Sequence, residues 1–213
     1  MTKIVDLTHL ILEGMPVYPG TEPPVLKKEC TIEENGFCEN KITLFSHTGT
    51  HMDAPAHLIK NAKPLDMFPI NQFYGSALLL DVSGMEGSVI ELKDLESCGI
   101  IPENVGFVLI YTGWSRYWGM DKYFIDYPVL SVESAERLGK LGLKVIGLDT
   151  ISADKIDTAE YEIHKIFLGN NTLIIENLTN FNLLPADQFT FSCFPMSFKE
   201  ADGSPVRAVG IIN

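Results

Sequence analysis

Three of the five histidines in this 213-residue chain lie within eleven consecutive positions, in the segment SHTGTHMDAPAH that runs from Ser46 to His57. Imidazole nitrogens and carboxylate oxygens are ligands that zinc and manganese accept at neutral pH, and His47, His51 and Asp53 supply three of them. A divalent ion held there would leave positions open for water and would lower the pKa of that water to produce a hydroxide nucleophile. The segment therefore predicts a metal site with hydrolytic chemistry.

Regular secondary structure does not bring these three side chains to one ion. In an extended strand, His47 and Asp53 share a face but lie roughly 20 Å apart, at about 3.3 Å per residue. In a continuous helix, Asp53 points away from the face that His47 and His51 share. A bend is needed, and Gly49, with Pro55 behind it, provides places for one. The alternative is a polar loop of unrelated histidines, each hydrogen-bonded separately.

The strands that must support this segment are predicted from short apolar runs. In the second half of the chain these runs alternate with helical patterns, which indicates βαβ crossovers. The runs cover residues 77–82, 107–112, 144–149 and 172–175. Each run has the length of a buried strand, so a sheet with parallel strands is expected.

Two antiparallel hairpins are also predicted. The first is centred on Glu34-Asn35-Gly36, where Asn-Gly is a strong turn signal, and the second on Asp202-Gly203. The flanking segments are residues 24–32 with 37–45 and residues 188–198 with 206–212. The second hairpin is expected to close the fold.

Two helices are predicted between the apolar runs. One follows the candidate N-cap Ser131 and ends at Gly142. Its apolar stripe consists of Val132, Ala135, Leu138 and Leu141. The other is predicted to begin near Asp157, which has capping-box spacing to Glu160, and to end at Gly169.

The composition fits a compact globular protein, with 46% hydrophobic and 21% charged residues. No repeat or linker divides the chain, so residues 1–213 are expected to form a single α/β domain with a mixed sheet, βαβ units and antiparallel hairpins. The 16 basic and 28 acidic residues give a formal charge of −12 without a basic cluster, so neither nucleic acid nor a membrane surface is an expected partner. Without a membrane-length apolar stretch or a secretory signal, a cytoplasmic location is expected.

The segment from His47 to His57 matches the pattern His-x-Gly-Thr-His-x-Asp-x-Pro-x-His at every fixed position. The chain thereby resembles the metal-dependent cyclase family, which contains bacterial kynurenine formamidases. Further family-like segments are Asp6-Leu7-Thr8, Met15-Pro16-Val17-Tyr18-Pro19-Gly20, Tyr111-Thr112-Gly113-Trp114, Gly147-Leu148-Asp149-Thr150 with Ser152 and Asp154, and Gly203-Ser204-Pro205-Val206-Arg207. The resemblance implies a fold similar to swivelling β/β/α domains and assembly as a homodimer or homotetramer.

The resemblance also implies a two-ion site, in which His47, His51 and Asp53 hold one zinc or manganese ion and Asp53 bridges to a second ion held by His164 and Glu176. His164 lies on a predicted helix and Glu176 directly follows an apolar run. Ligand sites in α/β sheets gather at the carboxyl ends of strands, which supports both residues. Taken alone, His164 also fits a helix residue with an ordinary hydrogen bond, and Glu176 a surface carboxylate.

In the family, the position of His57 acts in proton transfer, a role that suits an imidazole with a pKa near neutrality. The alternative is a histidine that only orients a metal ligand. Tyr18 occupies a position where formamidases of the family often carry Trp, so it is predicted to line the substrate pocket. The sequence leaves open the roles of His9, Trp114, Tyr117, Trp118 and Asp149.

These features predict a metal-dependent hydrolase of a small amide. The expected substrate is an N-formyl aryl amine such as N-formylkynurenine, with kynurenine and formate as products and tryptophan catabolism as the setting. One alternative is hydrolysis of another cyclic amide or lactam, such as an isatin-like ring, or a cyclase reaction. The other is a non-catalytic protein that binds a metal or a small acid. The chain has no Gly-rich phosphate loop and no Gly-x-Ser-x-Gly motif, which disfavours nucleotide-dependent and serine-hydrolase chemistry.

Overall fold

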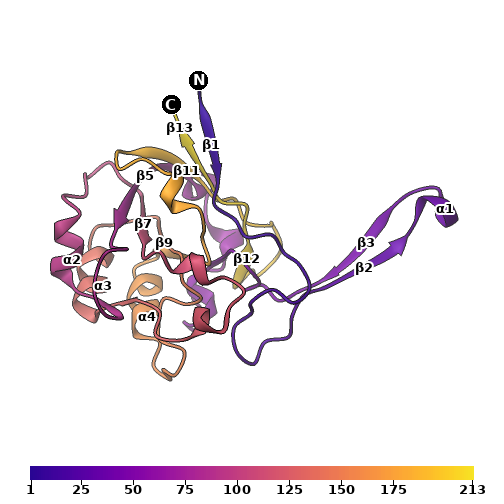
Figure 1. Cartoon of the computed structure of the whole chain (residues 1–213), viewed down its shortest axis with the longest axis horizontal. Coiled ribbons are helices and arrows are strands. Elements are labelled where there is room, and N and C mark those ends of the chain that lie inside the picture. The colour runs from indigo at the N-terminus through magenta and orange to yellow at the C-terminus, as the bar shows by residue number, and fades with distance from the viewer.

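A nine-stranded mixed sheet runs through the computed structural model, which describes residues 1–213 (Figure 1). The strand order is β1-β13-β11-β5-β7-β9-β10-β4-β12. These strands are β1 (Lys3–Asp6), β4 (His51–Asp53), β5 (Tyr74–Asp81), β7 (Phe107–Tyr111), β9 (Val145–Leu148), β10 (Leu173–Glu176), β11 (Phe189–Ser192), β12 (Gly203–Pro205) and β13 (Val209–Ile212). The central strands β5, β7, β9 and β10 are parallel, and antiparallel strands extend the sheet on both sides. The predicted mixed α/β class is confirmed.

Strands β7, β9 and β10 are buried on both faces, which explains why they read as continuous apolar runs rather than as alternating patterns. Along β7, Phe107 and Leu109 belong to one core cluster, whereas Val108 and Ile110 belong to the cluster on the opposite face. Gly147 in β9 permits close packing, because a Cβ there would lie 2.5 Å from Leu109 Cδ2. The predicted strands are thus present and form the centre of the sheet.

Helices pack against one face of this sheet, where their apolar residues join a common core cluster (Figure 1). They are α2 (Leu92–Ser97), α3 (Val132–Gly139) and α4 (Glu162–Gly169). The helix predicted after Ser131 is confirmed as α3, since the Ser131 hydroxyl accepts the Ser134 N–H and both Ala135 and Leu138 are buried. The helix ends at Gly139 rather than at the predicted Gly142, and both Val132 and Leu141 are exposed, so only Ala135 and Leu138 of the predicted stripe face the core.

The start predicted for the other helix, near Asp157, is wrong, because α4 begins at Glu162. The carboxylate of Asp154 accepts the backbone N–H groups of Ile163 and His164 at 3.0 Å each. A residue of the preceding loop therefore accepts the free N–H groups in the first turn of the helix, and no local capping pattern in the sequence marks this helix start. The predicted end of this helix is confirmed.

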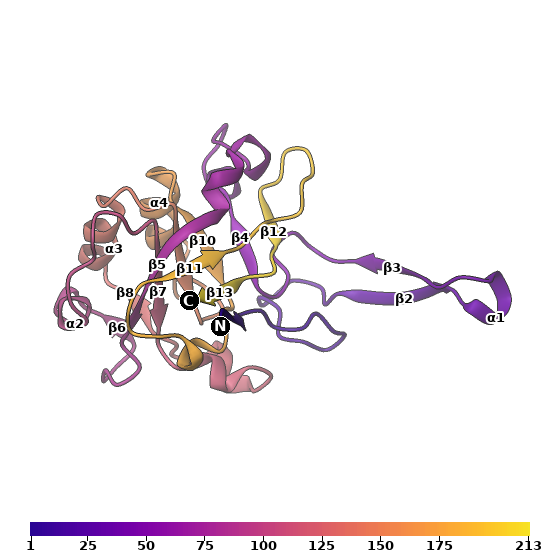
Figure 2. The same cartoon turned by 90° about the horizontal axis from the view of Figure 1, so that it is seen from above.

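An arm formed by residues 25–43 projects from the body of the molecule (Figures 1 and 2). It consists of β2 (Val25–Cys30), α1 (Ile32–Asn35) and β3 (Glu39–Thr43). The predicted antiparallel pairing is confirmed, but Asn-Gly does not form a tight two-residue turn. Instead Gly36, with a φ of 80°, ends the single helical turn α1. No residue of the arm is buried.

The predicted closing hairpin is confirmed only in part. Strands β11 and β13 pair antiparallel, but Asp202-Gly203 is not the turn between them. The chain instead crosses to the far edge of the sheet, where β12 pairs with β4 and Gly203 faces Asp53. This edge pairing, which local sequence does not indicate, brings the end of the chain beside the histidine segment.

The remaining elements are short. Strands β6 (Val89–Ile90) and β8 (Val129–Leu130) form a small parallel pair. Single 3₁₀ turns are η1 (Pro55–His57), η2 (Leu65–Met67), η3 (Ile70–Phe73), η4 (Trp114–Tyr117), η5 (Asp121–Phe124) and η6 (Phe181–Leu183). No helix has both the length and the apolar character needed to cross a membrane.

Candidate metal centre

The histidine segment enters the sheet through a bend at Gly49, as its spacing predicts. Gly49 has a φ of +67°, and a Cβ at this position would lie 2.9 Å from Met15 Cε. Its carbonyl accepts hydrogen bonds from His51 Nδ1 at 2.8 Å and from Asn177 Nδ2 at 2.9 Å. The chain then forms the buried strand β4, which carries His51 and Asp53.

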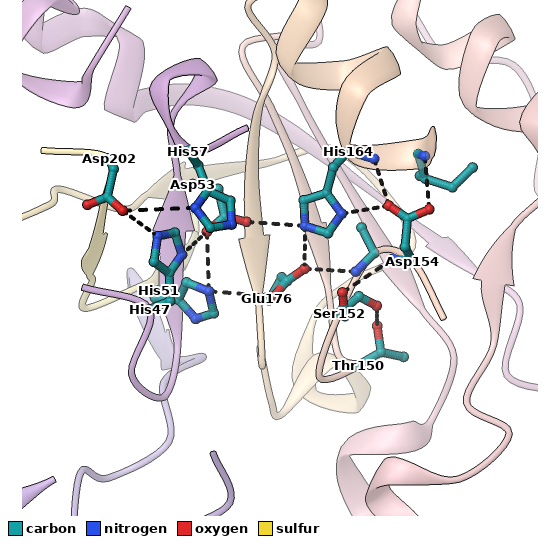
Figure 3. Close-up of polar contacts among 12 residues, drawn as sticks. His47, His51, Asp53, His57, Thr150, Ser152, Asp154, His164, Glu176 and Asp202 are labelled. Carbon is teal, nitrogen blue, oxygen red and sulfur yellow. Dashed lines mark hydrogen bonds and ion pairs between the residues drawn. The ribbon is translucent and has the colours of Figure 1, made fainter. Parts of the chain in front are cut away.

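The other two predicted ligands, His164 and Glu176, lie in the second half of the chain. Glu176 ends β10 and pairs directly with His51 across the antiparallel ladder, while His164 lies on α4. The His164 Nε2 lies 3.1 Å from Glu176 Oε1 and 3.7 Å from Asp53 Oδ2. The His51 Nε2 lies 3.2 Å from Asp53 Oδ1 and 3.5 Å from Glu176 Oε2. Together with His47, whose Nδ1 is 2.6 Å from Asp53 Oδ1, all five side chains converge (Figure 3).

The donor atoms form two groups that share Asp53. His47, His51 and Asp53 form one, and Asp53, His164 and Glu176 form the other, each with its ligand atoms within 4.8 Å of one another. The Oδ2 atom of Asp53 is buried and has no hydrogen-bond partner. A buried carboxylate oxygen without a partner is costly, and a cation supplies the missing interaction. The chemistry of these residues therefore fits a divalent metal ion.

Each histidine of the cluster directs one ring nitrogen toward this donor set and the other toward an acceptor outside it. His47 Nε2 lies 3.1 Å from Asp202 Oδ2, and His164 Nδ1 lies 2.7 Å from Asp154 Oδ2. His51 Nδ1 donates to the Gly49 carbonyl. Such outer partners select the tautomer and hold the plane of a metal-binding imidazole.

The charges of the cluster are strongly coupled. Burial by itself disfavours protonated His47 and His164, but the surrounding carboxylates outweigh it and raise the pKa of each to about 10. Burial likewise opposes ionisation of Asp53, yet the nearby His51 and His47 lower its pKa well below the ordinary range. The hydrogen bond from His47 lowers the pKa of Asp202 to about 2. The ionised carboxylates are therefore stabilised by positive charge beside them. Either protonated histidines or a bound metal ion supplies that charge.

His57 stands beside this cluster at the end of the turn η1 that Pro55 begins. Its ring lies tilted by 35° against the ring of His47, with centroids 3.9 Å apart, and its Nδ1 lies 3.9 Å from Asp202 Oδ2. Burial lowers the pKa of His57 below its usual value, although the carboxylates oppose the shift. A neutral imidazole at the edge of the donor set is placed to accept a proton.

A cavity of about 360 Å³ opens over the cluster, and the five candidate ligands and His57 line it. Its other walls include Tyr18, the candidate substrate-pocket residue, together with Phe45, Leu58 and Tyr161. The Tyr18 hydroxyl donates to the Ile156 carbonyl at 3.3 Å, which holds the ring against the cavity. No lysine or arginine lines this cavity. The walls therefore suit an aromatic group lying over a polar, metal-binding floor.

The residues whose roles the sequence leaves open do not line this cavity. Trp114, Tyr117 and Trp118 pack in an aromatic cluster around Tyr123, and the cavity residue Tyr18 packs against the same cluster. His9 stacks on Trp118 with ring centroids 3.9 Å apart. The Asp149 carboxylate accepts the backbone N–H and hydroxyl of Thr112 and the N–H of Ser115, so it organises the η4 turn.

Comparison with known proteins identifies the family. The model of a family described as "Putative cyclase" matches residues 5–155. This chain belongs to that cyclase family. The kynurenine formamidase of Bacillus cytotoxicus is 32% identical to it over 206 residues, which cover 96% of this chain and 95% of the relative. The kynurenine formamidase of Bacillus anthracis is 30% identical over 209 residues, which cover 98% and 97%.

Solved structures share the fold of this chain. A protein described as a potential metal-dependent hydrolase with cyclase activity superimposes with a TM-score of 0.84 at 25% identity, over 100% of this chain and 99% of the other. Isatin hydrolase A from Ralstonia solanacearum superimposes with a TM-score of 0.90 at 24% identity, over 100% of this chain and 92% of the other. The latter similarity shows a common fold.

Four residues of the candidate metal site have no role in the prediction from sequence. Asp154 and Asp202 contact candidate ligands, Asn177 holds the Gly49 bend, and Tyr161 lines the cavity with a backbone φ of +51°. Asp154 and Asp202 lie in or beside family-like segments, which is the one signal that points to them. For Tyr161 and Asn177 the sequence offers no such signal, because their positions follow from the loops around α4 and β10.

Proposed function

We propose that this cyclase-family protein is a metal-dependent amidohydrolase whose substrate is an N-formyl aryl amine, as in the conversion of N-formylkynurenine to kynurenine and formate. The observation that carries the proposal is the convergence of two ligand groups on Asp53 at the floor of a cavity with aromatic walls. The kynurenine formamidases that match nearly the full chain at 30–32% identity support this substrate class.

The proposed cofactor is zinc or manganese, with two ions in each subunit. His47, His51 and Asp53 would hold one ion, and Asp53, His164 and Glu176 the other. When bound, such ions polarise a carbonyl, stabilise the charge that develops on its oxygen and lower the pKa of a water molecule. Sharing of Asp53 between the groups favours two neighbouring ions over one.

The protein side chains supply the proton transfer and the substrate position. Water adds its oxygen to the formyl carbon, and His57 takes a proton from that water. The carbon–nitrogen bond then breaks, and His57 passes the proton to the departing amine nitrogen while formate is released. Tyr18, Phe45 and Tyr161 hold the aryl ring and exclude bulk water from the reacting group.

The test is a substrate panel with protein reconstituted separately with zinc and with manganese. Metal-loaded protein is expected to release formate and kynurenine from N-formylkynurenine, and chelation is expected to abolish turnover. Stoichiometric binding of metal without hydrolysis of any amide or lactone in the panel would instead support the non-catalytic binding protein.

A second substrate class, a neutral cyclic amide such as an isatin-like ring, is favoured by one observation. The amino-acid carboxylate of N-formylkynurenine is a group that proteins commonly bind with arginine, and the cavity has no lysine or arginine in its walls. Formanilide, which lacks this carboxylate, and isatin therefore belong in the panel. A kcat/KM for isatin well above the value for both formamides would overturn the formamidase proposal.

We also propose that the protein works as a homodimer or homotetramer through its arm. An isolated two-stranded hairpin is at best marginally stable in water, yet Val25, Ile32, Phe37 and Ile42 on the arm are each more than half exposed. Phe45, at the base of the arm, lines the cavity, so a second copy covering the arm would lie near the cavity mouth. Sedimentation velocity should show an oligomer that Phe37→Glu with Ile42→Glu dissociates, whereas a wild-type monomer at micromolar concentration would refute it.

A small-molecule partner is proposed rather than nucleic acid or a membrane surface, and the charge of −12 supports this choice. A cytoplasmic location stays a prediction.

A further inference from the structure

Asp202 contacts two histidines that have different expected roles. Its Oδ2 atom lies 3.1 Å from Nε2 of the candidate ligand His47 and 3.9 Å from Nδ1 of His57 (Figure 3). No other carboxylate lies within 4 Å of the His57 ring nitrogens. The side chain of Asp202 is 46% exposed, so it borders the cavity rather than the core.

The fold holds Asp202 in this place. The adjoining strand β12 pairs with β4, and the Asp202 carbonyl accepts the Ala54 N–H at 2.9 Å. Gly203 packs against the flat ring of His47, where a Cβ would lie 2.4 Å from His47 Cε1. Backbone pairing on one side of Asp202 and ring packing beside it therefore place its carboxylate next to both imidazoles.

We propose that Asp202 is a positioning residue that links the metal-binding side of the site to its proton-transfer residue. It accepts the Nε2–H of His47, which leaves His47 Nδ1 facing Asp53 and the metal position. It also attracts Nδ1–H of His57, which leaves Nε2 of that ring as the nitrogen that takes and returns the reaction proton. The part that concerns His57 rests on the proposed hydrolase function, whereas the part that concerns His47 does not.

A competing role for Asp202 is direct metal binding, because His47, His57 and Asp202 also place their ligand atoms within 4.8 Å of one another. The two roles differ in the number of ions bound. If Asp202 is a positioning residue, its substitution changes only the affinity for a metal ion. If Asp202 is a metal ligand, its substitution lowers the number of ions bound per chain, even at high metal concentration.

The test compares Asp202→Asn with Asp154→Asn, its matched control. Both aspartates contact the outer nitrogen of a candidate metal ligand, but Asp154 contacts His164 and lies away from His57. Both variants are expected to weaken zinc binding about 10–100-fold in a chelator competition while the number of bound ions is unchanged. Loss of one zinc from Asp202→Asn alone would overturn the positioning role in favour of direct ligation.

A double-mutant cycle with His57→Ala then tests the link to proton transfer. At saturating zinc, Asp202→Asn should lower kcat at least about tenfold with little change in KM, and should have almost no further effect in the His57→Ala background. Asp154→Asn and His57→Ala should combine additively. Asp202→Glu, which keeps the carboxylate, should restore part of kcat. Additive effects of Asp202→Asn and His57→Ala, or a wild-type kcat in Asp202→Asn, would overturn the proposal.

One readout needs no substrate and therefore separates this inference from the proposed function. In zinc-loaded protein, the ring ¹⁵N resonances of His57 should shift in Asp202→Asn and stay in place in Asp154→Asn. If wild-type protein hydrolyses no amide, the hydrolase proposal fails, and the resonances still decide whether Asp202 acts on His57. Unchanged His57 resonances in Asp202→Asn would refute the link.

Discussion

His164 and His47 each direct one ring nitrogen to the metal position and the other to an aspartate, but the two aspartates have different surroundings. Asp154 is nearly buried, with 7% of its side chain exposed, and accepts two backbone N–H groups as well as the His164 ring. Asp202 is 46% exposed and lies between two histidines. The centre therefore has a core half, built from α4 and β10, and an edge half, built from β12 and the Gly49 bend.

This difference in exposure indicates that the two halves of the centre have different roles. In the core half, the start of α4 and the candidate metal ligand His164 both depend on the carboxylate of Asp154, so displacement of that carboxylate would disturb the fold as well as the site. In the edge half, the carboxylate is open to the cavity and is shared with a histidine that binds no ion in the proposed site. We expect the core half to govern retention of the protein's structure as well as metal affinity, whereas the edge half affects metal affinity through His47 and turnover through His57.

The largest effect is expected at His51, which touches both halves. Its Nε2 lies near Asp53 and Glu176, and its side chain is only 5% exposed. His51→Ala should abolish metal binding and hydrolysis together, measured by elemental analysis and by formate release. Circular dichroism serves as the folding control. Wild-type metal content in a folded His51→Ala protein would contradict its assignment as a ligand.

His57→Ala should distinguish proton transfer in the edge half from metal binding. The substitution removes the proposed proton carrier of the edge half but none of the five candidate ligands. Metal content should stay at the wild-type level, while kcat falls by about 10²–10⁴-fold. Turnover near the wild-type rate would exclude His57 from proton transfer and leave it the role of orienting a neighbour.

A smaller effect is expected from Gly203→Ala, which tests the backbone support of the edge half. The new methyl group would lie 2.4 Å from His47 Cε1, so the His47 ring or strand β12 must move. Metal affinity should fall about 10–100-fold, measured by chelator competition.

The matched control for this substitution is Gly84→Ala, because a Cβ at Gly84 meets no atom within 4 Å. It should leave metal affinity unchanged. Equal affinities of the two alanine variants would show that the edge half tolerates displacement of His47.

The smallest effect is expected outside both halves, at His9. Burial lowers the pKa of His9 from 6.5 to about 4, and its Nε2 has no hydrogen-bond partner. Between these pH values the unfolded chain binds more protons than the folded protein, so the free energy of unfolding decreases as the pH falls. At pH 5 the loss should be about 1–2 kcal/mol relative to pH 8.

His9→Phe is the control, because it keeps an aromatic ring on Trp118 but cannot be protonated. Urea unfolding at pH 8 and pH 5 should show a shallower pH dependence for this variant than for wild type. Parallel pH dependences would mean that His9 titrates normally in the folded protein.

The sequence predicted most of the donor set because ligand type and local spacing are chemical properties of short segments. The His47–His57 segment needed a bend, and Gly49 was the residue able to make it. Strands β7, β9 and β10 were also predictable, because strands buried on both faces are continuous apolar runs. The features that were missed depend on contacts distant in sequence. Asp154 caps a helix that begins eight residues later, and Asp202 meets His47 from 155 positions away.

By itself, the sequence determined which side chains can bind a metal, which strands are buried and which family the chain resembles. The tertiary structure decided how those side chains meet. The pairing of β4 with β10 and β12 places Glu176 opposite His51 and Gly203 opposite Asp53, and so joins donors from both halves of the chain. Strand pairing over such separations is selected by packing of the whole sheet, because neighbouring residues along the chain do not encode it. For that reason the support of each histidine, and the link from His47 to His57 through Asp202, emerged only from the folded protein.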